Sequence, residues 1–164
     1  MRVVADAATV RLEIDGGGVA VVWDLDALEG VGRLEGRPFD LEPRLDPGRW
    51  ELARILSAAL EDGRLLAVAA MRPVGASGHG AERVAGALVR DRRAAVLDEV
   101  LLSVEYDAAG AARRVGLELY EAPDSLPLRV AGDRHAITGE GDVALHLRAE
   151  GVEGAGRLSV LRAR

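Results

Sequence analysis

The stretch SVEYDAAGAARRVGLELYEAPDSLPLRVAGDRHA, from Ser103 to Ala136, decides the fold of this chain. It holds three runs in which apolar and polar residues alternate, separated only by turn segments at 107–110 and 123–125. Alternation with a period of two is typical of strands with one buried face. Because a parallel crossover needs about a dozen or more residues, such short connections predict antiparallel hairpins.

The rest of the chain extends this pattern. Strands with one apolar face must curl over that face or pack it against another layer. We therefore expect a mainly β fold: a single domain over residues 1–164 in which an antiparallel meander closes into a lipocalin-like β-barrel. The predicted strands lie at 9–14, 19–25, 64–74, 95–107, 113–121, 126–133, 143–149 and 156–164.

Two segments predict helices beside the barrel. Asp46 suits a helix cap, and the residues that follow it recur at helical spacing, which predicts one amphipathic helix over 46–61. A second, shorter helix is predicted after the glycines at 75, 78 and 80. The apolar residues with helical spacing are Trp50, Ala53, Leu56 and Leu60.

The glycine-rich loop at 75–80 also invites a nucleotide-binding interpretation. A strand, a glycine-rich loop and a helix occur in this order in dinucleotide sites, and Asp98 lies where a ribose-binding acid would follow. However, the spacing is GxxGxG rather than GxGxxG, and antiparallel hairpins follow instead of βαβ units. We therefore take the loop as structural.

The amino-acid composition excludes all cysteine-based sites and suggests what kind of organism the chain comes from. The 164 residues include no cysteine, which excludes disulfides, a thiolate nucleophile and cysteine metal ligands. All 21 basic residues are arginine, and lysine, asparagine and glutamine are absent, as codon bias in a GC-rich bacterium would produce. Heat tolerance is a compatible second explanation, because amide side chains are thermolabile.

Charge and hydropathy argue against nucleic-acid binding, a signal peptide and a membrane span. The net charge of −6 is spread along the chain, and only five residues are aromatic, which disfavours nucleic-acid binding. No stretch has the length of a signal-peptide core or of a ~20-residue membrane span. We expect a cytoplasmic protein that needs no cofactor.

Strand parity offers one catalytic candidate group. If Leu117 and Leu119 lie on the apolar face, then Glu118, Tyr120 and His146 share the polar one. Facing a lumen, these three side chains would form an acid–base group, and Asp98 and Glu99 are further candidate carboxylates. Facing solvent, they would be inert, with Glu118 and Arg148 forming an exposed ion pair.

The aromatic residues and histidines are the remaining candidates for ligand contacts and metal binding. Trp23, Trp50, Tyr106 and Tyr120 are candidate ligand contacts, although the tryptophans also suit core anchors. His79, His135 and His146 show neither HxH nor HxxxH spacing, so no metal site is expected. No serine lies in a GxSxG elbow.

The motif YDAAGAARRVGLELYEAPDSLPLRVAGD, together with EGVEGAGRLSVLR near the C-terminus, resembles lipocalin-like proteins related to carotenoid 1,2-hydratase (hydroxyneurosporene synthase). The similarity covers roughly residues 97–162 and consists of a Tyr-Asp-x-x-Gly hairpin, a Leu-Glu-Leu strand and a glycine-containing closing strand. It implies a lipocalin-type barrel and an apolar, isoprenoid-like ligand. This chain departs from the family in having one short domain instead of two tandem barrels, and no catalytic residue is carried over.

Three functions remain open at this stage. The leading hypothesis is a protein that holds an apolar lipid, steroid or terpenoid-like molecule in the lumen of the barrel, since small inward residues leave space. The second is a hydratase, isomerase or cyclase that acts on such a molecule through a carboxylate. The third is an interaction module, with or without homo-oligomerisation, that uses an apolar strip on the 46–61 helix or on an edge strand.

Overall fold

The computed structural model of the chain describes residues 2–5, 9–14, 19–24, 37–38, 50–77 and 81–163, and the side chains of the last two ranges. Within these residues the regular structure consists of strands, with no α-helix and therefore none that is long and apolar enough to cross a bilayer. The strands are β1 (Arg2–Ala5), β2 (Thr9–Ile14), β3 (Val19–Asp24), β4 (Arg37–Pro38), β5 (Trp50–Leu60), β6 (Leu65–Pro73), β7 (Arg83–Arg90), β8 (Arg93–Val96), β9 (Glu99–Tyr106), β10 (Ala112–Tyr120), β11 (Leu128–Gly139), β12 (Asp142–Ala149) and β13 (Val152–Arg162).

The strands form two antiparallel sheets, which confirms the mainly β, antiparallel prediction. The small sheet has the order β1-β2-β3-β4, and the nine-stranded sheet has the order β8-β7-β6-β5-β13-β12-β11-β10-β9. Consecutive strands are hairpin neighbours except β4 and β5, which lie in different sheets, and β8 and β9, which are the two edges of the large sheet. The last strand, β13, pairs with β5. This one long-range pairing joins the two halves of the large sheet.

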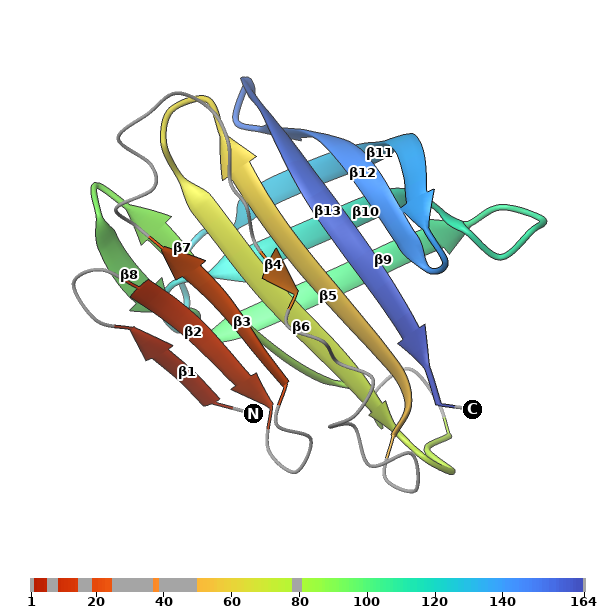
Figure 1. The fold of residues 1–164 in the computed structure, drawn as a ribbon. Coiled ribbons are helices and arrows are strands. Elements are labelled where there is room, and N and C mark those ends of the chain that lie inside the picture. The colour runs from red at the N-terminus through yellow and green to blue at the C-terminus, as the bar shows by residue number, and fades with distance from the viewer. Residues whose placement is uncertain are drawn as a thin grey trace.

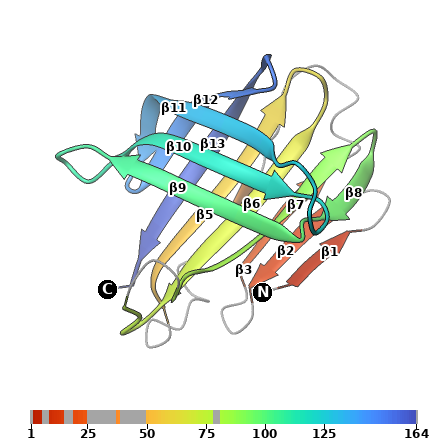
Figure 2. The same ribbon diagram turned by 180° about the vertical axis from the view of Figure 1, so that it is seen from behind.

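The large sheet coils over one of its own faces. In Figures 1 and 2, strands β9–β11 cross over β5–β7, so the sheet forms both walls around a shared interior. Just before β9, the backbone N–H of Leu97 donates a hydrogen bond to the carbonyl oxygen of Gly86 in β7, at 3.0 Å. Strands β8 and β9 nevertheless remain the two edges of the sheet, so its ladder of hydrogen bonds is open and not a closed ring.

The inner face of this coil holds the main core. Along β12 the inward residues are buried, whereas His146 and Arg148 between them are exposed, and β10 and β11 alternate similarly. Burial of a leucine or valine side chain stabilises the fold by about 1.5–3 kcal/mol. The largest fully buried inner side chains are Leu56, Leu66, Leu88, Leu119, Leu147 and Leu158.

A second apolar cluster lies on the opposite face of β5, β6 and β7. It includes Ile55, Leu65, Met71 and Val89, all at most 4% exposed. The small sheet lies over this face, with β1 and β2 beside β6 and β7 (Figure 1). The central strands are thus buried on both faces, which explains why β6 reads as a continuous apolar run.

Both predicted helices are wrong within the described residues. Residues 50–60 of the expected 46–61 helix form strand β5, and 83–90 of the expected shorter helix form β7. Strands buried on both faces lose the polar alternation that identifies a strand, and their alanine-rich sequences imitate a helical pattern. The apolar strip expected on the first helix therefore does not exist, because β5 lies in the middle of the sheet.

Close approach of neighbouring strands limits the inner face to small residues at some positions. A Cβ added to Gly154 in β13 would lie 2.4 Å from the carbonyl oxygen of Ala59 and 2.7 Å from a methyl carbon of Leu60. Because the nearest atom belongs to backbone, a rotamer change cannot relieve this clash. Gly154 therefore allows the β13–β5 pairing that joins the two halves of the sheet.

We expect Gly154→Ala to lower the free energy of unfolding by about 1–3 kcal/mol, because overpacking at a backbone contact forces the strands apart. Urea denaturation followed by circular dichroism measures the change. The matched control is Gly139→Ala, whose added Cβ would meet its nearest atom at an ordinary 3.4 Å. Equal stability of the two variants would show that the β13–β5 contact is not tight.

Candidate functional site

The two ends of the coiled sheet differ. One end is sealed by large buried side chains at Leu60, Leu66, Leu88, Leu119 and Leu128. At the other end several inward residues, among them Leu52, Val104 and Val160, are only half-buried, and we call this the open end. The open end is formed by the start of β5, the ends of β9, β11 and β13, and the start of β10 and β12.

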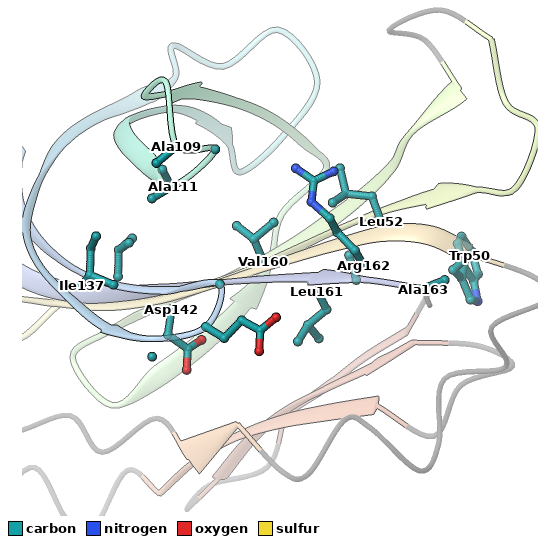
Figure 3. A pocket seen from close by; sticks show the side chains of 17 residues that line it. Trp50, Leu52, Ala109, Ala111, Ile137, Asp142, Val160, Leu161, Arg162 and Ala163 are labelled. Carbon is teal, nitrogen blue, oxygen red and sulfur yellow. The ribbon is translucent and has the colours of Figure 1, made fainter.

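A cavity of about 690 Å³ lies at the open end (Figure 3). This volume falls within the range of pockets that hold small organic ligands, about 300–1,000 Å³. Many lining residues are alanine or glycine, which leave the space unfilled. The lining comprises Trp50, Leu52, Ala53, 109–112, Ile137, 139–143 and 160–163.

Side chains reach this cavity from both faces of β13. Leu52, Val160 and Arg162 point to one side, toward the hairpin that carries Ala109 and Ala111 (Figure 3). This side continues the inner face, because Val160 packs against the main core. On the other side, Leu161 belongs to the second cluster, together with Trp50. The larger apolar wall therefore belongs to the mouth of the coiled sheet.

The hairpin above the cavity is held by Asp107. Its carboxylate Oδ1 accepts hydrogen bonds from the backbone N–H groups of Ala109 and Ala111, at 2.9 and 3.0 Å. Its Oδ2 accepts a 2.6 Å hydrogen bond from Arg134 in β11. The Asp107 carboxylate thus stabilises the β9–β10 turn and links it to strand β11 through Arg134. The Arg134 hydrogen bond, and next the backbone N–H of Ala111, lower the pKa of the Asp107 carboxyl below its ordinary value.

Charged residues also occupy inner-face positions at the open end. Arg54 lies on the same face of β5 as Leu56, and its guanidinium pairs with Glu82. The two side chains are only 11% and 16% exposed. The Nε atom of Arg54 is buried and has no hydrogen-bond partner in the described part of the chain. A buried arginine also lies at the sealed end, where Arg64 pairs with Asp62 and Glu150.

The candidate acid–base group lies elsewhere. Glu118, Tyr120 and His146 are on the outer, polar face of the large sheet, opposite the core. The Tyr120 hydroxyl donates to Glu118 at 3.1 Å, and this hydrogen bond, followed by burial, raises the pKa of the tyrosine. Asp98 and Glu99 are exposed. Asp98, Glu99 and Glu118 line a second pocket beside β9 and β10, which is more open to solvent than the cavity at the open end. The enzyme hypothesis needs a candidate carboxylate in an enclosed pocket.

The ion pairs and histidines of the outer face differ from what the sequence predicts. Glu118 pairs with Arg129 and Arg148 pairs with Glu153, so the expected Glu118–Arg148 ion pair is wrong. The sequence did not reveal that His135 and His146 meet across β11 and β12, with ring centroids 5.4 Å apart. His79 lies outside the described residues. Among the residues that the structure describes, no three metal-ligating side chains converge.

The four candidate ligand contacts are scattered. Trp50 lines the cavity, and its buried indole Nε1 has no hydrogen-bond partner among the described residues. Tyr106 ends β9 at the open end but does not line the cavity, and Tyr120 lies on the outer face. The backbone of Trp23 pairs with Val10 in the small sheet, and its side chain lies outside the described residues.

The cavity residues that sequence reasoning missed come mostly from strand ends and turns. Ala109, Ala111 and Ile137 gave no chemical signal, because small or apolar residues near turns occur in any β protein. Arg162 was detectable in principle, since alternation places it on the same face as Val160. The sequence does not show that the β9–β10 hairpin and the end of β13 line the same cavity.

Comparison of the chain with protein-family models, with curated proteins and with solved structures found no match. The chemistry that the cavity serves therefore has to be inferred from its own residues.

We expect Glu82→Ala to lower the free energy of unfolding by about 3 kcal/mol, because it leaves the Arg54 charge buried without a partner. The exposed pair Arg148–Glu153 provides the control, and Glu153→Ala should cost at most about 1 kcal/mol. Urea denaturation measures both variants. If Glu82→Ala costs no more than the control, the inner-face ion pair is solvated in solution.

Asp107 makes stability depend on pH in a defined direction. A carboxyl whose pKa is lower in the folded state stabilises the fold above its unfolded pKa of about 4, and this contribution disappears as the pH falls through the folded pKa. Asp107→Asn should therefore be less stable than the wild type at pH 7, with a difference that shrinks below pH ~4. Urea midpoints from pH 7 to pH 2 measure it, with Asp124→Asn in another turn as the control. A constant difference across this range would contradict the Arg134–Asp107 interaction.

Proposed function

We propose that this protein binds an apolar small molecule in the cavity at the open end of the coiled sheet. The observation that carries the proposal is the asymmetry of the interior, which is sealed by leucines at one end and widens to about 690 Å³ at the other. Apolar side chains on a water-filled wall gain free energy when a ligand removes them from water, about 25 cal/mol per Å². Ile137, 61% exposed on this wall, would be covered by such a ligand.

The resemblance to carotenoid 1,2-hydratase-like lipocalins supports the same proposal. We take the coiled sheet as a lipocalin-like barrel whose ring of strands is left unclosed between the edge strands β8 and β9. In such a barrel the ligand enters through one end of the sheet, which here would be the open end. Lipids, steroids and terpenoid-like molecules are the candidate ligands, and the candidate contacts Trp50 and Tyr106 both lie at this end.

The test is thermal stabilisation by uncharged apolar probes: 1-dodecanol, farnesol and progesterone. A ligand that binds only the folded state stabilises it by RT ln(1 + [L]/Kd), about 2.7 kcal/mol at a hundred times the Kd. We expect at least one probe to raise the melting temperature of the wild type by several degrees.

Ala109→Trp should abolish this shift, because the indole would fill the cavity from the hairpin above it. The matched control is Ala108→Trp, one residue earlier in the same turn and not part of the cavity lining. It should keep the shift. No response of the wild type to any probe, or an undiminished shift in Ala109→Trp, would contradict binding in this cavity.

A further inference from the structure

Arg162 differs from most arginines of the large sheet in lacking a counter-charge. Arginines on both faces pair with carboxylates, as Arg129 does with Glu118 and Arg134 with Asp107. Arg162 is exposed, and in the part of the chain that the structure describes it has neither an ion pair nor a hydrogen bond from its side chain. Its guanidinium therefore remains available for a ligand.

The sheet register places Arg162 within a group of inner-face cations. Arg162 is paired with Leu52, which on its other side is paired with Arg72. Arg54 lies two residues along β5 from Leu52 and is thus a diagonal neighbour of both, at the roughly 7–8 Å typical of such positions. Because Arg54 pairs with Glu82 and Arg72 with Glu51, one unit of positive charge is left over in this group.

The two described carboxylates that line the cavity, Glu140 and Asp142, do not neutralise this charge. Asp142 points to the opposite side of β13 from Arg162 (Figure 3) and pairs with Arg157. Glu140 is exposed in the β11–β12 turn and makes no ion pair with Arg162. Among the residues that the structure describes, the side of the cavity that faces the 107–111 hairpin therefore combines an apolar wall with one free guanidinium, that of Arg162.

We propose that the ligand is an anionic amphiphile, whose apolar body lies against Leu52 and Val160 and whose head group is bound by Arg162 at the rim. This inference rests on the proposed function and specifies the class of ligand. A guanidinium presents paired N–H donors that match a carboxylate in a bidentate geometry. Beside an apolar wall the interaction is stronger than in bulk water, because the local dielectric constant is lower.

The test compares three amphiphiles with the same twelve-carbon chain, each below its micelle concentration: laurate, 1-dodecanol and dodecylamine. Isothermal titration calorimetry at pH 7 gives the affinities. For the wild type we expect laurate to bind about tenfold or more tightly than dodecanol, since hydrogen bonds to charged groups are the strong ones. Dodecylamine should bind most weakly, because its ammonium would meet Arg162.

Arg162→Gln should bind laurate and dodecanol with nearly equal affinity. The control is Arg93→Gln, which removes an exposed arginine in β8, outside the cavity lining. It should keep the wild-type preference for laurate. Arg162 is exposed at the end of its strand, so the variant should keep its fold, which its melting temperature verifies.

The outcomes separate the two proposals. Binding of dodecanol without a preference for laurate, or a preference that survives Arg162→Gln, would overturn the anionic head group and leave the apolar site intact. Failure of all three amphiphiles to bind the wild type, together with no thermal shift from the uncharged probes, would overturn the apolar site itself.

Discussion

The structure depends on the need of one antiparallel sheet to cover its own apolar face. A sheet with a row of leucines and valines on one side must remove them from water, and in the described residues no helix lies against that side. The large sheet achieves this by coiling until β9–β11 lie opposite β5–β7. The β13–β5 pairing makes the coil possible, and the glycine at 154 permits the close contact on which that pairing depends.

Coiling of the sheet also determines where a cavity can form. Side chains near the middle and one end of the coil meet across a short distance and pack, whereas strand ends that diverge at the other end leave a cavity. The turns that cap these strands become its walls, and Asp107 shapes and fastens the turn that lies above it. Buried arginines occur near both ends of the coil, Arg54 at the open end and Arg64 at the sealed end, and each pairs with carboxylates. The same geometry thus supplies the space, the apolar wall and the free cation.

Much of the large sheet was predictable from the sequence, and the reasons are local. Strands β10, β11 and β12 alternate along most of their length, so the outward parity of His146 and Arg148 follows from the pattern. The single strand predicted at 95–107 is instead divided between β8 and β9. Strands β5 and β7 were misread as helices because the small sheet buries their second face, a fact that local sequence does not contain, whereas β6 was predicted correctly as a buried strand. The pairing of β13 with β5 was likewise invisible, since it joins residues about a hundred positions apart.

The site was less predictable than the fold. Chemical reasoning selected Glu118, Tyr120 and His146 because they are reactive residue types on one parity, but that parity faces away from the interior. The cavity is instead lined by small residues whose importance lies in the volume that they leave empty. An empty volume results from the tertiary arrangement of the chain, and no residue type in the sequence predicts it. Of the predicted ligand contacts whose side chains the structure describes, Trp50 is the one that lines this space.

The most direct test of a cavity formed by coiling is a crystal structure of the protein under xenon pressure. Xenon enters apolar cavities without needing any specific chemical group. The coiled sheet predicts xenon density between the 107–111 hairpin and Val160, at the open end, and none among the leucines of the sealed end. An empty open end, or a hairpin packed directly onto Val160, would contradict the central claim.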